Sequence, residues 1–255
     1  MQTKTFVSLT GADQVDRLFH EDNQDGIDWV DFVFDEQVVK VFPDMISRSV
    51  PQYWEVNRQT ALWAKKFYRP GTNIYDLGAS LGAVSWEIAQ QLLPQNPQII
   101  AVEQSSAMVE QFRRNLNANP MENIQVLEQD VCQAQLENAS VVVCNYTLQF
   151  VCPSLRENLL QEIYRALCPK GVLLLAEKIA MESPEIEQKI RKLHHEWKQA
   201  QGYSLNEIQK KSRAIANVMP VDSISDHRDR LSKVGFSSVI LWSQQYNFIA
   251  LVAQK

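Results

Sequence analysis

Short apolar runs alternate with segments of helical periodicity along most of this 255-residue chain, and this alternation constrains the fold more than any other feature. The strand-like runs cover residues 73–77, 98–103, 124–127, 140–145 and 172–177. Helix-like segments lie near residues 83–93, 106–118 and 154–167. Alternation of this kind predicts an α/β fold, in which helices cover a mostly parallel sheet.

Two helices are predicted to interrupt the alternation after the fifth strand. The first begins with Ser183 as its N-cap and a proline at the first helical position, where proline is favoured. The second begins after Ser204, which forms a capping box with Glu207, and Pro220 stops it. Residues 183–220 are therefore predicted to be a helical insertion.

The chain ends in two strand-like runs, residues 238–242 and 246–253, which follow a predicted helix over 225–234. Only a few polar residues join the two runs, and a link so short forces antiparallel pairing. A seven-stranded, mostly parallel sheet with a C-terminal antiparallel hairpin resembles the Rossmann-like fold of class I methyltransferases. It differs from the ordinary nucleotide-binding order, which ends with a parallel strand.

The sequence before the first strand predicts two further parts. Residues 1–28 are polar in their second half and are predicted to be a flexible N-terminal extension. Phe42 and Ile46 belong to a series of apolar residues with helical spacing, so residues 29–70 are predicted to form a helical cap. Residues 71–255 then form the Rossmann-like domain that contains the insertion.

Composition excludes several classes of protein. With 45% hydrophobic and 22% charged residues, the chain is too apolar to be intrinsically disordered. A net charge of −5 offers no overall basic field for a phosphate backbone, so direct binding of nucleic acid is not expected. The apolar runs are too short to span a membrane and the N-terminus lacks a signal-peptide pattern, which together predict a cytoplasmic protein. Four cysteines without a C-x-x-C pair predict no metal site.

The most informative motif is the loop after the first strand-like run, which reads D-x-G-x-S-x-G over residues 76–82. It has neither the Gly-Lys-Ser/Thr ending of a phosphate loop nor the spacing of a dinucleotide loop. It resembles the D/E-x-G-x-G-x-G loop of enzymes that bind S-adenosyl-L-methionine (SAM), with a serine in place of the middle glycine. The predicted cofactor residues in this loop are Asp76, Gly78, Ala79, Ser80 and Gly82.

Polar residues at the ends of three further strands extend this predicted site. Glu103 closes the second strand-like run, where a carboxylate can accept hydrogen bonds from both hydroxyls of a ribose. Asp130 follows the third, at the place where SAM enzymes usually accept a hydrogen bond from the adenine amino group. Asn145 ends the fourth, where its side-chain carbonyl either orients an acceptor amine or caps the strand. Two adjacent residues, Gln104 and Val131, complete the predicted cofactor site.

Several strings are more specific than the general methyltransferase pattern, and they run without long gaps from about Asp31 to the C-terminus. They include Val41-Phe42-Pro43-Asp44-Met45-Ile46, Thr147-Leu148-Gln149-Phe150, Gly202-Tyr203-Ser204 and Asn217-Val218-Met219. These strings resemble the carboxy-SAM synthases, a family of the class I methyltransferase superfamily. The resemblance implies a homodimer that makes carboxy-SAM from SAM and prephenate, as the donor for carboxymethylating a tRNA wobble uridine.

By the same resemblance, five residues fall on positions that contact the ligand in that family: Tyr53, Gly78, Glu103, Asp130 and Asn145. Of these, Tyr53 and Asn145 are the candidate catalytic residues, because either can position the group that receives or donates the transferred carbon. The sequence does not indicate which of them, if either, takes a proton.

One departure from the family bears on the reaction. In the family, an arginine on the second insertion helix binds the extra carboxylate of carboxy-SAM, and here Ser212 stands in its place. A buried carboxylate left without a partner costs about 3 to 5 kcal/mol. Arg213 lies about 100° further round the helix, and Lys211 cannot form the two-pronged contact of an arginine. Both residues are candidate contacts for a carboxylate.

Three functional hypotheses follow. The leading one is a SAM-dependent methyltransferase acting on a small, partly apolar acceptor, built as a diverged paralogue on the carboxy-SAM synthase scaffold. The alternative is carboxy-SAM synthesis itself, with carboxy-SAM as the bound ligand. The third is a non-catalytic SAM-binding partner subunit, which methyl transfer by the isolated chain would exclude.

Overall fold

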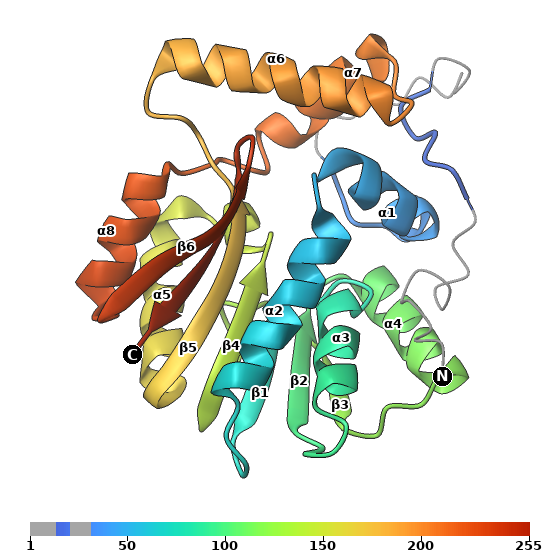
Figure 1. Ribbon diagram of the computed structural model, residues 1–255. Coiled ribbons are helices and arrows are strands. Elements are labelled where there is room, and N and C mark those ends of the chain that lie inside the picture. The colour runs from blue at the N-terminus through green and yellow to red at the C-terminus, as the bar shows by residue number, and fades with distance from the viewer. Residues whose placement is uncertain (1–13, 21–31) are drawn as a thin grey trace.

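The computed structural model describes residues 14–20 and 32–255, and its centre is a seven-stranded sheet with the order β3-β2-β1-β4-β5-β7-β6 (Figure 1). Pairing is parallel from β3 to β5, whereas β7 of the C-terminal hairpin pairs antiparallel with both β5 and β6. The predicted class I methyltransferase architecture is therefore confirmed. The strands are β1 (Asn73–Leu77), β2 (Gln98–Glu103), β3 (Ile124–Glu128), β4 (Ala139–Asn145), β5 (Leu167–Lys178), β6 (Ser238–Gln245) and β7 (Phe248–Gln254).

Two strands begin two or more residues away from their predicted starts. β5 begins at Leu167 rather than at residue 172, because Leu167 already pairs with Ala139 ahead of an irregularity in the register. The segment between Leu167 and residue 172 includes Pro169 and Gly171, which are typical of a turn, so the sequence predicts a later start for this strand. In the C-terminal hairpin, Tyr246 lies in the turn with a φ of 51°, and β7 starts two residues later than predicted.

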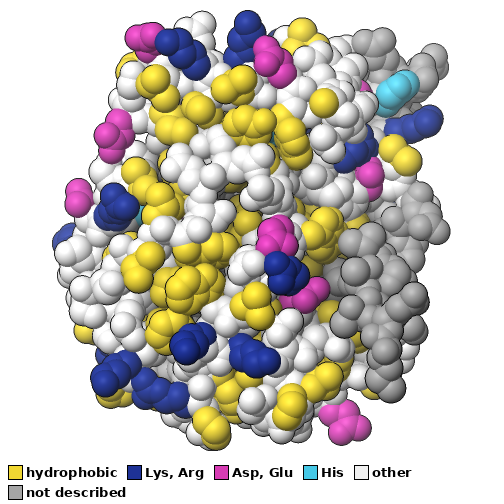
Figure 2. Space-filling view, viewed as in Figure 1, with side chains coloured by type: hydrophobic (Ala, Val, Ile, Leu, Met, Phe, Trp, Pro, Cys, Tyr) yellow, Lys and Arg dark blue, Asp and Glu magenta, His cyan; other side chains and the backbone are white. Residues whose placement is uncertain are grey.

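Helices cover both faces of the sheet. One face packs against α2 (Tyr53–Phe67), α3 (Ala83–Gln91) and α4 (Ser106–Ala118), and the other against α5 (Pro153–Ala166) and α8 (Ile224–Val234). Ile74 and Tyr75 show how one strand serves both layers, since Ile74 belongs to the α2–α3–α4 side and Tyr75 to the α5–α8 side. Hydrophobic side chains are visible on the outer surface over β6 and α2 (Figure 2). Ile240 of β6 is among the exposed large hydrophobic residues.

Three helices lie over the carboxyl ends of the strands: α1 (Glu36–Ser49), α6 (Pro184–Ala200) and α7 (Leu205–Ala216) (Figure 1). Ser183 and Ser204 cap the last two as predicted, Ser204 through a capping box with Glu207. The sequence therefore determines where the insertion helices begin. We call α1, α6 and α7 together the roof, because they cover the edge of the sheet where the loop motif lies. Among the described helices, none combines the length and apolarity needed to cross a membrane.

A short N-terminal segment, residues 14–20, packs against the roof. Asp16 and Phe19 are both buried in it, and the Asp16 backbone N–H donates to Asp44 Oδ2 on α1 at 2.7 Å. The rest of the predicted flexible extension, residues 1–13 and 21–28, lies outside the described residues.

Candidate functional site

A cavity of about 400 Å³ lies between the carboxyl ends of the strands and the roof. Its floor comes from the residues that follow β1, β2, β3 and β4, and its walls include side chains of α1, α2, α6 and α7. Of the predicted cofactor and catalytic residues, those that line the cavity are Tyr53, Asp76, Gly78, Ala79, Ser80, Glu103, Gln104, Asp130, Val131 and Asn145. The fold therefore brings together residues from five separate parts of the chain.

The loop after β1 forms the floor through two left-handed residues. Gly78 has a φ of 76°, and a Cβ at this position would lie 2.2 Å from Thr147 Oγ1, so only glycine fits. Ser80, in place of the expected middle glycine, also adopts a positive φ of 51°. The backbone N–H of Ser80 donates to Glu103 Oε2 at 2.8 Å, which ties the loop to the end of β2.

Two predicted site residues lie elsewhere. Gly82 does not line the cavity, because it is the left-handed N-cap of α3 and packs closely on α4, where a Cβ would lie 2.1 Å from the Phe112 ring. Arg213 is exposed on α7 and is absent from the cavity wall. The structure therefore places neither residue at the cavity wall, and the assignment of Gly82 to the cofactor site stays a prediction.

The acidic residues gather at the β1, β2 and β3 end of the cavity. Asp76 accepts hydrogen bonds from the Ser85 N–H at 3.1 Å and the Ser85 hydroxyl at 2.6 Å, and burial raises its pKa to about 6. Glu103 accepts from Ser105 N–H at 2.9 Å in addition to Ser80. Asp130 accepts from the Cys132 N–H at 2.9 Å. Backbone donors thus hold the carboxylates of Glu103 and Asp130 in fixed orientations.

This end of the cavity fits SAM. Each oxygen of Glu103 accepts one backbone hydrogen bond and keeps a further acceptor site, so the carboxylate can still receive two ribose hydroxyls. Asn145 donates from Nδ2 to Thr60 Oγ1 at 3.2 Å, whereas its buried Oδ1 has no partner among the described residues. A buried acceptor without a donor, at a cavity wall, is a position for a ligand N–H or O–H group.

An aromatic wall stands beside Asn145. The Tyr53 and Tyr146 ring centroids are 5.8 Å apart, and Tyr146 in turn contacts the Phe248 ring at 6.3 Å. Burial raises the pKa of Tyr53 to about 12, so its hydroxyl keeps its proton at neutral pH. In the cavity Tyr53 can therefore donate a hydrogen bond but does not serve as a base.

His194 also belongs to this wall. Its ring lies 5.2 Å from that of Phe248, and Nε2 is 3.0 Å from the Ser49 carbonyl oxygen. Burial, followed by the charge of Lys198, lowers the pKa of His194 to about 3, so the imidazole is neutral at neutral pH. A neutral ring with one nitrogen bound to the backbone holds α6 against α1.

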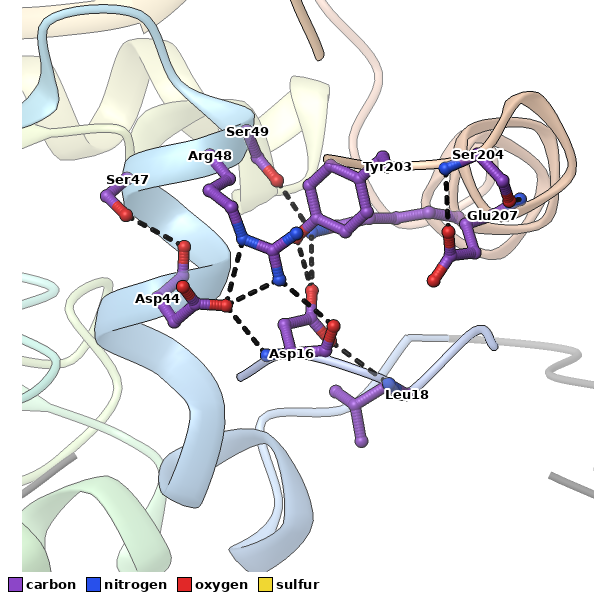
Figure 3. A network of polar contacts seen from close by, with 10 residues as sticks. Asp16, Leu18, Asp44, Ser47, Arg48, Ser49, Tyr203, Ser204 and Glu207 are labelled. Atoms are coloured by element: carbon purple, nitrogen blue, oxygen red, sulfur yellow. Dashed lines mark hydrogen bonds and ion pairs between the residues drawn. The ribbon is translucent and has the colours of Figure 1, made fainter. Parts of the chain in front are cut away.

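The opposite end of the cavity is basic. Lys211 reaches the cavity from α7, where its Nζ donates to Ser49 Oγ at 2.8 Å and lies 3.8 Å from Asp16 Oδ2. The surrounding network joins residues 14–20, α1 and the insertion (Figure 3). In it Arg48 donates to the Asp16 backbone oxygen at 3.0 Å, and Tyr203 donates its hydroxyl to Asp16 Oδ2.

Two lysines of this basic end are missing from the sequence prediction. Lys178 follows the last core position of β5, and Lys198 lies one helical turn after His194 on α6; both line the cavity. The spacing of four residues between His194 and Lys198 is the one sequence feature that links Lys198 to the site, since it puts both side chains on one face of the helix. Lysine on a solvated helix is so common that this spacing alone does not distinguish a site.

The comparisons with known proteins agree with this geometry. A methyltransferase domain family matches residues 74–171, which include the loop motif and the ends of β2, β3 and β4. The carboxy-S-adenosyl-L-methionine synthase of Vibrio cholerae serotype O1 is 46% identical over 226 residues, covering 88% of this chain and 92% of that protein. The synthase of Escherichia coli O1:K1 is 44% identical with the same coverage.

Solved structures of lower identity share the fold. A putative SAM-dependent methyltransferase from Methanococcus maripaludis has a TM-score of 0.58 at 21% identity, covering 88% of this chain and 94% of that one. Human N-acetylserotonin methyltransferase in complex with SAM has a TM-score of 0.59 at 19% identity, covering 86% and 55% respectively. Given relatives this similar over nearly their whole length, the chain is a SAM-dependent transferase and belongs to the carboxy-SAM synthase family.

Proposed function

We propose that this protein makes carboxy-SAM from SAM and prephenate. The observation that carries the proposal is a buried cation, Lys211, at the wall of the cavity, one residue before Ser212 at the position of the family's arginine. A lysine ammonium there offers the extra carboxylate of carboxy-SAM a charged partner, although without the two-pronged geometry of arginine. The loss of the arginine is therefore a change of contact rather than a loss of the reaction.

The chemistry needs positioning more than a strong base. One S-methyl hydrogen is replaced by the ring carboxyl group of prephenate: a proton leaves the methyl carbon, a carbon–carbon bond forms from it to the carboxyl carbon, and the bond between that carboxyl carbon and the ring breaks. The electron pair left on the prephenate ring expels the ring hydroxyl, which leaves with the proton as water. Glu103 and Asp130 would hold the ribose and adenine, and Asn145 Oδ1 and the Tyr53 hydroxyl would orient the reacting groups.

A methyltransferase with a small, partly apolar acceptor is the second candidate. The observation that favours it is the apolar lining of the roof side of the cavity, where Phe34, Phe42 and Met45 of the α1 region line the same space. Lys211 also already has Asp16 and Ser49 beside it, so a second carboxylate would have to share this lysine. In this case SAM supplies the methyl group and the acceptor lies against the aromatic wall.

The identity of the nucleoside that copurifies with the protein distinguishes the two candidates. The freshly purified chain is denatured, and the released small molecules are identified by mass spectrometry. Carboxy-SAM in the extract, or its retention when it is added before washing, supports the synthase. SAM or S-adenosylhomocysteine without any retained carboxy-SAM would instead support the methyltransferase. We also infer a homodimer by family resemblance, which light scattering tests directly.

A further inference from the structure

Two lysines at the basic end of the cavity lack an acidic partner. Lys198 is 8% exposed and Lys178 is half-buried, and both line the cavity. Within residues 14–20 and 32–255, no hydrogen bond or ion pair joins either ammonium group to an acceptor. Lys211 differs from both, since Ser49 and Asp16 lie beside its Nζ. The cavity therefore holds two lysine side chains that no acidic residue in the described part of the protein pairs with.

Two of these lysines act on the third. Burial, followed by the charges of Lys178 and Lys211, lowers the pKa of Lys198 to about 7. Burial also lowers the pKa of Lys178. The charge of Glu187 on α6 offsets only part of this shift, because it acts from beyond ion-pair distance. Since a buried cation without a partner is costly, this arrangement becomes favourable when an anion enters the cavity.

The charge of the cavity also differs between its two ends. Asp76, Glu103 and Asp130 lie at or just after the carboxyl ends of β1, β2 and β3, whereas Lys178, Lys198 and Lys211 come from β5, α6 and α7. SAM carries a sulfonium, an ammonium and one carboxylate group, so its cations suit the acidic end, and the three lysines exceed the single anionic group that it brings. Complementary charge predicts that a second ligand in the cavity is an anion.

We propose that Lys178 and Lys198 form a subsite that binds a carboxylate group of the second substrate. The identification of that substrate as prephenate rests on the proposed function, whereas the negative charge follows from the lysines alone. An ammonium–carboxylate contact in this buried setting is a charge-assisted hydrogen bond, which is stronger than its counterpart between neutral groups. Lys178 and Lys198 are thus binding residues for the second ligand, whereas Lys211 is the proposed contact for the extra carboxylate of carboxy-SAM.

Calorimetry on protein saturated with S-adenosylhomocysteine tests the subsite, with prephenate and malonate as separate probes. We expect Lys198→Met to weaken prephenate binding by about tenfold or more, with Lys178→Met acting in the same direction. The matched control is Lys192→Met on the same helix, where the side chain is 79% exposed. Affinity for S-adenosylhomocysteine, measured first, should be the same in all four proteins, because that ligand occupies the acidic end.

The outcomes separate the subsite from the reaction. If the wild type binds malonate but not prephenate, and Lys198→Met loses malonate, the anion subsite stands and the proposed function fails. If both lysine variants bind prephenate as the wild type does, the subsite is wrong even when carboxy-SAM is produced. Failure of the wild type to bind either probe also overturns it.

Discussion

Lys211 Nζ lies 3.8 Å from Asp16 Oδ2, so a residue of the N-terminal segment neutralises a lysine of the second insertion helix at the wall of the cavity. Both side chains are buried, at 11% and 0% exposure. The contact joins the N-terminal segment to α7, one residue before Ser212. Residues 14–20 therefore help to define the basic end of the site.

Replacing Asp16 tests this contact. Asp16→Asn leaves Lys211 buried without its counter-charge, and we expect the free energy of unfolding to fall by about 3 kcal/mol. Urea denaturation at neutral pH measures the loss, and Asp229→Asn, on an exposed part of α8, serves as the control. Equal stability of Asp16→Asn and the wild type would show that the two charges do not depend on each other.

Glu103 is predicted to anchor the ribose. Glu103→Ala should weaken SAM binding by about tenfold or more in calorimetry, because charge-assisted hydrogen bonds are lost. Glu128 pairs with Glu103 in register on the neighbouring strand but is exposed, so Glu128→Ala is the matched control. Unchanged SAM affinity in Glu103→Ala would remove the ribose assignment.

Gly78 is predicted to be irreplaceable for a steric reason. A methyl group there would meet Thr147, whereas the same change at Gly71, whose φ is also positive at 80°, meets nothing within 4 Å. Both alanine variants carry the strain of the left-handed backbone, about 1 to 3 kcal/mol, but only Gly78→Ala also displaces the cavity floor. We expect Gly78→Ala to lose binding of S-adenosylhomocysteine and Gly71→Ala to retain it; equal binding by the two would contradict the clash.

Glu177 makes stability depend on pH. It is 1% exposed, and burial raises its pKa to about 8, so the native carboxyl keeps a proton that the unfolded chain releases near 4.5. Stability is therefore full below about pH 4.5 and falls as pH rises towards 8, by on the order of a few kcal/mol in all.

Glu177→Gln keeps a neutral acceptor for the Leu148 N–H, which Glu177 Oε1 accepts at 3.0 Å. Its free energy of unfolding should lose this part of the pH dependence and exceed that of the wild type above pH 8. Denaturation at several pH values measures both curves, with Glu162→Gln on the exposed side of α5 as control. Parallel curves for Glu177→Gln and the wild type would rule out the buried proton.

Local patterns were enough to predict the sheet and most of its cofactor end. β1, β2 and α4 begin and end at the predicted residues, because apolar runs and the cap at Ser105 define them locally. Glu103, Asp130 and Asn145 come together because parallel strands end at one edge of the sheet. Each of these three residues lies at the end of a strand or directly after it, so local sequence is enough to place it.

The basic end could not be predicted in the same way. Lys178, Lys198 and Lys211 converge only when the insertion folds back over the sheet, and nothing local distinguishes them from solvated lysines. The shape of its guanidinium favours Arg213 over Lys211 as a carboxylate contact, but Arg213 is exposed on α7, whereas Lys211 lines the cavity. Ser49 on α1 and Asp16 in residues 14–20 contact Lys211, and these contacts fix which face of α7 is turned towards the cavity.

The most direct test of the proposed reaction is turnover with labelled substrate. The purified protein is incubated with SAM and prephenate carrying ¹³C in its ring carboxyl group, and the nucleosides are analysed by mass spectrometry. We predict carboxy-SAM that contains the label, formed only when prephenate is present. Unchanged SAM in that mixture, with a protein that binds SAM normally, would contradict carboxy-SAM synthesis.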